Sequence, residues 1–137
     1  MSTPRPAPRA RRRRGRGPGD RGAVSLELAI IFPAVMLAIF MIIQTGLWYH
    51  ARSVALSAAQ RGVERARVQG ATIAQGTGAA SDFLDRAGGG IAQRAVTGSD
   101  GATVRIEVSG RVETWIPGLS LTVRQHASAA RERVTAP

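Results

Sequence analysis

The chain has 137 residues, a formal charge of +10 and no cysteine, so neither disulfides nor thiolate metal sites stabilise it. A chain of this length has room for one small domain, whose modest core is marginally stable without help from partners or a membrane. Eight of the nineteen arginines but only one of the nine acidic residues lie in residues 1–22, so the basicity belongs mainly to an N-terminal segment.

Residues 1–22 consist mostly of Arg, Pro, Gly and Ala without apolar periodicity, which predicts a disordered leader. Clustered arginines are typical of nucleic-acid binding, but they also keep the flank of a membrane helix in the cytoplasm and attract anionic lipid. Because an apolar helix is predicted directly after them, we favour membrane topology over a nucleic-acid partner. The expected location is the cell membrane, with a cytoplasmic N-terminus and an extracytoplasmic C-terminal domain.

Residues 23–49 are predicted to form a single transmembrane helix. Residues 28–43 contain no charge and no hydrogen-bonding side chain, and the full stretch is longer than the roughly 30 Å hydrocarbon core at ~1.5 Å per residue. A cleaved secretory signal is disfavoured, because the apolar run is too long and no small-x-small exit follows it. Pro33 predicts a helix kink. Trp48 and Tyr49 stand where interfacial aromatic residues anchor a spanning helix.

Glu27 is the one charged residue within this helix. An ionised acid costs roughly 2.5–3.5 kcal/mol at the centre of a membrane helix and less near an end. Glu27 lies about one turn inside the apolar run, so its cost is partial. Two interpretations stay open: it pairs at the interface with Arg21 or a lipid amine, or it has a defined cationic partner in the membrane.

The residues around this boundary resemble a known pattern. Arg-Gly followed by Ala-Val-Ser-Leu-Glu and a long apolar helix is similar to the class III signal of type IV pilins and pseudopilins. The wider runs Gly22–Pro33 and Gly46–Gly62, with the internal proline, the aromatic pair and the Ala-Ala-x-x-Gly ending, resemble the TadE/TadG-like proteins of bacterial tight-adherence (Tad or Flp) pilus systems. The resemblance covers residues 21–62 strongly and the remainder only in outline.

The resemblance implies a function in assembly. In that family a prepilin peptidase cuts after the glycine on the cytoplasmic side, which makes Gly22 and Ala23 the processing site. Glu27 is then the fifth mature residue and the membrane carboxylate for subunit pairing. The implied partners are the peptidase, the membrane and other Tad pilus or pseudopilin subunits, in a filament or in a basal complex of a pilus or related secretion apparatus. The alternative is an unprocessed single-pass anchor whose Arg-rich tail binds anionic lipid or nucleic acid.

Residues 50–100 are predicted to be a helical extension followed by Gly-rich linkers. Small residues mark one face of the extension: Ala51, Ala55, Ala58, Ala59, Gly62 and Ala66. Packing between subunits and packing onto the protein's own sheet are equally good explanations of this face. Gly70 is the expected helix C-cap, a short helix is expected at 79–87 after the Gly76-Thr-Gly78 break, and Gly88–Gly90 is expected to be a flexible link.

Residues 101–130 are predicted to form a small antiparallel β module. Val104, Ile106 and Val108 alternate with polar residues, Gly110 suggests a bulge, and Pro117-Gly118 predicts a turn before a second strand over 119–129. Trp115 is expected in the core, and residues 131–137 are expected to be a disordered tail. The predicted fold class is α+β: a transmembrane helix extending into a long helix, then a small sheet outside the membrane.

Nothing in the sequence indicates an enzyme. His50 and His126 have no second ligand at metal-binding spacing, and no serine has G-x-S-x-G surroundings. The carboxylates are scattered along the chain without a pair suited to acid–base chemistry. We therefore expect no catalytic residue, no metal and no cofactor.

Overall fold

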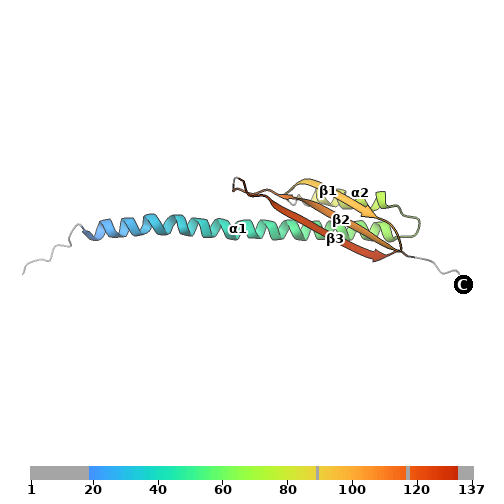
Figure 1. Cartoon of the computed structure of the whole chain (residues 1–137), viewed down its shortest axis with the longest axis horizontal. Coiled ribbons are helices and arrows are strands. Elements are labelled where there is room, and N and C mark those ends of the chain that lie inside the picture. The colour runs from blue at the N-terminus through green and yellow to red at the C-terminus, as the bar shows by residue number, and fades with distance from the viewer. Residues whose placement is uncertain (1–18, 89, 117, 133–137) are drawn as a thin grey trace, which may run out of the picture. The chain divides into compact units, whose positions relative to one another are not determined.

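The computed structural model describes residues 19–88, 90–116 and 118–132, with side chains from residue 24 onward. Most of the predicted leader and residues 133–137 of the predicted tail lie outside them. The elements are α1 (Gly19–Arg67), α2 (Ile73–Ala87), β1 (Ile91–Ser99), β2 (Thr103–Val112) and β3 (Leu121–Ala130). This is the predicted α+β class, with one long N-terminal helix and a small antiparallel sheet (Figure 1).

Helix α1 is one uninterrupted helix through Pro33 and beyond the aromatic pair. Contacts divide the chain into two compact units, residues 1–38 and residues 39–137, and α1 contributes to both. The second unit, here called the module, contains the C-terminal part of α1, α2 and the sheet. The predicted extension of the apolar helix into a long helix is therefore confirmed.

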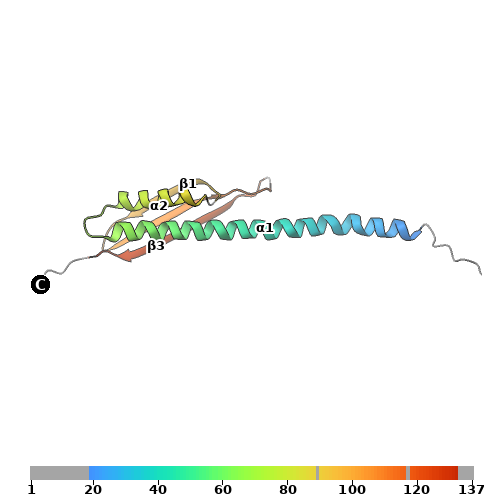
Figure 2. The same cartoon turned by 180° about the vertical axis from the view of Figure 1, so that it is seen from behind.

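The sheet has the strand order β1-β2-β3, with both pairs antiparallel. Within the module, α1 and α2 cover the same face of this sheet, as the two opposite views show (Figures 1 and 2). Alternate residues of β2 point to this face, where Val104, Ile106 and Val108 are fully buried. The other face is polar: Glu107 lies 3.3 Å from the guanidinium of Arg124 on β3.

The small-residue face of α1 packs inside the module. All six residues of this face are buried: Ala51, Ala55, Ala58, Ala59, Gly62 and Ala66. Small side chains let the helix backbone come close to its neighbours. Of the two interpretations left open by the sequence, packing onto the protein's own sheet and second helix is the one the fold adopts.

Helix α2 begins earlier than predicted. Thr72 accepts a hydrogen bond from the backbone N–H of Gln75, and the Gln75 side chain accepts one from the N–H of Thr72, which is a capping box. The helix then runs through Gly76 and Gly78, so the prediction of a break followed by a helix at 79–87 is wrong. The glycine at 76 has a packing reason: a Cβ there would lie 2.7 Å from the carbonyl oxygen of Gly62 on α1.

Alanine substitutions at the two glycines of α2 are expected to have opposite effects. At Gly76 the added methyl group would also lie 2.6 Å from the Cβ of Ala66, so overpacking of about 1–3 kcal/mol outweighs the ~0.5–1 kcal/mol gained from helix propensity. At Gly78 nothing lies within 4 Å, so only the gain remains. Urea midpoints of pulse proteolysis, on the full chain in micelles, measure both. Equal shifts at the two positions would contradict the close helix contact.

Strand β1 lies where a linker was predicted. Gly88 ends α2 with φ of 58° and donates its N–H to the carbonyl of Leu84, and β1 begins three residues later. The prediction of Gly-rich linker up to residue 100 is therefore wrong. The bulge predicted at Gly110 belongs to the partner strand: β2 is continuous, whereas β1 shifts register between Ala92 and Ala95.

The first residues of the predicted tail are docked. Arg131 donates to the carbonyl of Ala71 at 2.7 Å and to the Asp100 carboxylate at 3.1 Å, and the N–H of Glu132 donates to the carbonyl of Arg67. The predicted disorder is thus wrong for these two residues. Helix α1 ends at Arg67, and Gly70, the expected C-cap, follows it with φ of 79°.

Candidate functional site

The N-terminal part of α1 exposes large apolar side chains around its whole circumference. Leu26, Ile30 and Leu37 are each 66% exposed, and an 18-residue window of the helix has a mean hydropathy of 2.7 with none of it buried. Water is a poor solvent for such a surface, whereas lipid is a good one. The chain has this one helix long and apolar enough to cross a membrane among its described residues, which suits a single-pass membrane protein.

The predicted processing residues are the fourth and fifth of this helix, which begins within the segment predicted to be a disordered leader, so that prediction is wrong for residues 19–22. The backbones of Gly22 and Ala23 belong to α1, which begins at Gly19; their side chains, like that of Arg21, are outside the described ones. The first four N–H groups of a helix have no intrahelical partner, so its first turn is the part that opens most easily. The Gly22–Ala23 bond therefore lies at the end of the turn that opens most easily.

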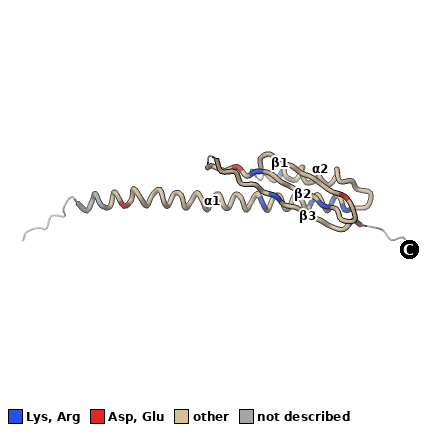
Figure 3. Tube along the Cα trace, in the orientation of Figure 1, with Lys and Arg blue, Asp and Glu red and all other residues tan. Residues whose placement is uncertain are grey.

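Glu27 lies exposed on the apolar surface of α1. None of the ion pairs among side chains from residue 24 onward involves it. The next charged residue along the chain is Arg52, and the other described charges lie on the C-terminal part of α1, on α2 and on the sheet and its loops; Figure 3 marks those in view. The described side chains thus give Glu27 no cationic partner, and its pairing with Arg21 or with a cation of another molecule stays a prediction.

The two aromatic residues at the other end of the apolar run differ in environment. Trp48 packs against the core of the module, and the guanidinium of Arg52 lies 5.7 Å from its ring centroid. Tyr49 is 67% exposed. An exposed tyrosine beside a half-buried tryptophan fits a helix segment that leaves lipid and enters the module at this level.

Two polar residues precede these aromatics. The hydroxyl of Thr45 donates to the carbonyl of Met41 at 2.8 Å, so it is satisfied within the helix. Gln44 is only 7% exposed, and its amide nitrogen has no hydrogen-bond partner among the described residues. The burial of Gln44 was missed from the sequence. Its only signal is the spacing of Gln44, Trp48 and Ala51, which extends the buried stripe of α1 toward the N-terminus.

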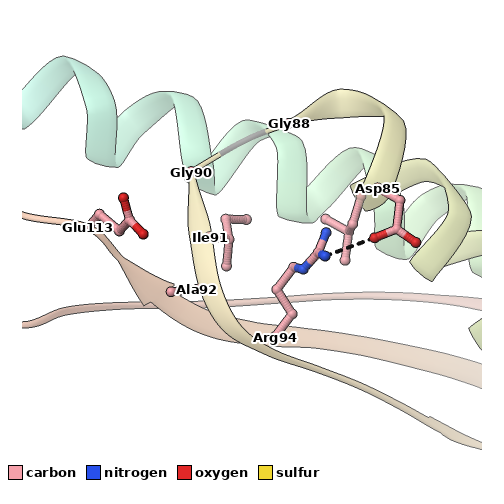
Figure 4. A pocket seen from close by; sticks show the side chains of 8 residues that line it. Asp85, Gly88, Gly90, Ile91, Ala92, Arg94 and Glu113 are labelled. Carbon is pink, nitrogen blue, oxygen red and sulfur yellow. Dashed lines mark hydrogen bonds and ion pairs between the residues drawn. The ribbon is translucent and has the colours of Figure 1, made fainter.

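The charged groups nearest to a surface hollow serve to join elements. A hollow of about 280 Å³ lies between α2, β1 and the end of β2 (Figure 4). On its wall the Arg94 guanidinium points at the Asp85 carboxylate, 2.8 Å away, while Glu113 lies apart from them. Both partners of the pair are partly exposed, so it contributes at most about 1 kcal/mol to the α2–β1 junction.

Among the described residues, no group of three or more His, Asp or Glu side chains could hold a metal ion. The residues that the sequence predicted as functional also do not converge on one site. Gly22, Ala23 and Glu27 lie near the start of α1, whereas Trp48 and Tyr49 lie near its middle. The predicted residues are therefore spread along α1 rather than gathered around a pocket.

In the comparison with known proteins, the part of the chain that matches lies within α1. Residues 22–64 match the family model described as TadE-like protein, which confirms the resemblance seen in the sequence. The match begins at the predicted processing glycine and ends three residues before α1 does, so it covers neither α2 nor the sheet. No curated protein and no solved structure matches the chain.

Proposed function

We propose that this protein, TadE-like over residues 22–64, takes part in assembling a Tad-type (Flp) type IV pilus or a related secretion apparatus. A prepilin peptidase cuts between Gly22 and Ala23 on the cytoplasmic side. The mature protein then stays in the membrane through α1, with the module on the extracytoplasmic side. Its action is assembly, without a catalytic step of its own.

One observation supports this proposal above the others. The TadE-like match starts at Gly22, where an Arg-rich segment meets an apolar run, and the one carboxylate of that run, Glu27, follows five residues later. A glycine and a glutamate at this spacing are common in isolation. Their place at the start of a membrane helix, on the arginine-rich flank that the positive-inside rule keeps in the cytoplasm, is much less common.

In this proposal Glu27 forms an ion pair between neighbouring subunits in the membrane. Cleavage creates a charged amine at Ala23, and the Glu27 carboxylate of a neighbouring subunit is its partner. Two charges paired in a low-dielectric medium contribute little net stability, but separating them is costly. The pair therefore fixes the register between subunits. The exposed position of Glu27 on α1 leaves it available for this contact.

Gly22→Leu is expected to abolish processing. Intact mass and N-terminal sequencing of the membrane-extracted wild-type protein should give a chain that begins at Ala23, and the variant should begin at Met1 or Ser2. The physical reason is steric: a glycine before the cut lets the peptidase approach the backbone closely, and a leucine side chain blocks that approach. Cutting at this position also reports that residue 22 faces the cytoplasm.

Gly46→Leu is the matched control, because a Cβ at Gly46 in the same helix would have no neighbour within 4 Å. It should be processed like the wild type. A full-length wild-type chain in cells that process their other prepilins would refute the processing step. That outcome would favour the alternative, an unprocessed anchor whose arginine tail binds anionic lipid or nucleic acid.

A further inference from the structure

The loop between β2 and β3 exposes apolar side chains among its described residues. Trp115 is 82% exposed, and Ile116 and Leu119 are about as exposed as lipid-facing residues of α1. We call these three residues the apolar turn. The prediction that Trp115 belongs to the core is therefore wrong. Burying three such side chains in an apolar phase is worth roughly 1.5–3 kcal/mol each, so their exposure calls for a partner.

Backbone geometry holds the apolar turn in place. The N–H of Leu119 donates to the carbonyl of Ile116 at 3.2 Å, and Gly118 has φ of 83°, a conformation that glycine adopts without strain. The hydroxyl of Thr114 lies within hydrogen-bonding distance of the carbonyls of Ile116 and Leu119. These hydrogen bonds bring Thr114, Ile116 and Leu119 together among the described residues of the loop.

The apolar turn lies at the end of the sheet where α1 emerges from lipid. Val112 and Glu113, which lead into it, line a hollow together with Leu47 and His50 of α1. Figures 1 and 2 show the β2–β3 loop projecting from this end of the sheet, beside the middle of α1. The turn therefore stands level with the aromatic pair Trp48 and Tyr49, which marks the expected membrane surface.

The burial of Gln44 shows that the module reaches still further along α1. Gln44 precedes Leu47 and His50 in the helix and is 7% exposed, whereas Ile43 beside it is 50% exposed. The module as a compact unit begins at Ile39. One side of α1 is thus buried within the apolar run that is predicted to cross the membrane.

The chemistry of the turn fits the interfacial region of a bilayer. Residues 114–120 carry no charge, and tryptophan is the side chain that most favours the boundary between headgroups and acyl chains. We propose that Trp115, Ile116 and Leu119 insert into the outer boundary of the same bilayer that α1 spans, as a second membrane contact of this chain. The inference requires α1 to be membrane-spanning, but it does not depend on peptidase processing or on pilus assembly.

A second contact fixes the orientation of the module. A single helix leaves the module free to rotate about the helix axis and to tilt with it. A second point of insertion, beside α1 and on the sheet side, removes much of this freedom. The polar face of the sheet, with Arg105, Glu107 and Arg124, is then held at a constant angle to the membrane surface.

Tryptophan fluorescence tests the insertion directly, because the chain has only two tryptophans. The full-length Trp48→Phe variant, with Trp115 as its one tryptophan, is reconstituted into phosphatidylcholine–phosphatidylglycerol vesicles. Lipids brominated near the headgroup end of the acyl chain should quench its emission several-fold more than lipids brominated near the chain end. Aqueous acrylamide should quench it weakly.

The matched control places the tryptophan at the opposite end of the strands. Gly101 lies between β1 and β2, where an added Cβ would meet only an ordinary contact at 3.9 Å. The variant Trp48→Phe/Trp115→Phe/Gly101→Trp should show the reverse pattern, with strong acrylamide quenching and weak quenching by brominated lipid. Resistance of both variants to alkaline extraction shows that α1 is inserted in each case.

Two outcomes would overturn the inference. If acrylamide quenches Trp115 as strongly as the tryptophan at position 101, then the turn stands in water. If neither acrylamide nor brominated lipid quenches Trp115, then protein covers the turn, and a second copy or another subunit is its partner. Loss of alkaline resistance would instead refute the spanning role of α1, which keeps the two failures distinguishable.

Discussion

Replacing Glu27 by leucine is expected to leave cleavage at Gly22–Ala23 intact and to abolish assembly. Under the proposed function, the variant forces the Ala23 amine of a neighbouring subunit into the membrane without its counter-ion. Removing one partner of a buried ion pair costs about 3–5 kcal/mol, which corresponds to a loss in association of roughly 100- to 4,000-fold. Co-purification with other pilus-assembly subunits from solubilised membranes measures the loss, and intact mass confirms the cleavage.

A double-mutant cycle makes the Glu27 prediction specific. Glu27→Asp retains the carboxylate and should retain most of the association. In a Gly22→Leu background the Ala23 amine is never formed, so adding Glu27→Leu should cause no further loss. Equal effects of Glu27→Leu in processed and unprocessed chains would show that the carboxylate acts through another partner, such as a lipid amine.

Replacing Ile106 by alanine is expected to cost the module about 2–5 kcal/mol, a large share of the stability of a domain this small. Ile106 is fully buried at the centre of β2. Its side chain fills a notch left by glycines on three other elements: Gly62 on α1, Gly76 on α2 and Gly98 on β1. Because those positions have no side chains to move inward, the cavity left by alanine stays open.

Pulse proteolysis of the full chain in micelles measures the effect as a lower urea midpoint. Ile106→Val removes one methyl group and should cost about 0.5–1.5 kcal/mol, which makes the series graded. Thr97→Ala on the exposed face of the same sheet should stay within about 0.5 kcal/mol of the wild type. If Ile106→Ala behaved like Thr97→Ala, the proposed centre of the core would be wrong.

Elements with a strong one-dimensional pattern could be predicted from the sequence. The length and uniform apolarity of residues 28–43 predict a membrane helix without any knowledge of the surrounding fold. The alternation of Val104, Ile106 and Val108 determines a strand with one buried face, and the turn at Gly118 determines where the chain reverses. In these segments local preference and tertiary packing agree, so the sequence suffices.

Elements that depend on contacts with distant parts of the chain could not be predicted in the same way. Gly76 indicates a helix break by propensity, yet it is there because α1 and α2 touch at this point, and only the fold shows that contact. Strand β1 contains small and polar residues with weak alternation, because it is an edge strand with few buried side chains. Gly98 of this strand makes room for Ile106, but in the sequence alone a glycine at this position indicates a linker.

The environment of Trp115 illustrates a limit of another kind. A large aromatic residue at the end of a strand pattern is most often core, and that rule placed it there. The rule assumes that a side chain faces either the protein interior or water. In a chain with a membrane helix, an apolar side chain can also leave water by facing lipid.

The last described residues lie at the end of the module opposite the β2–β3 loop. Glu132 is hydrogen-bonded to Arg67 at the end of α1, whereas the β2–β3 loop lies at the opposite end of the strands. The ten residues of β2 span up to about 34 Å at ~3.4 Å per residue. Under the membrane contact inferred for the apolar turn, the module acts as a spacer of at most about that length, and Glu132 lies at its far end, beside the last turn of α1.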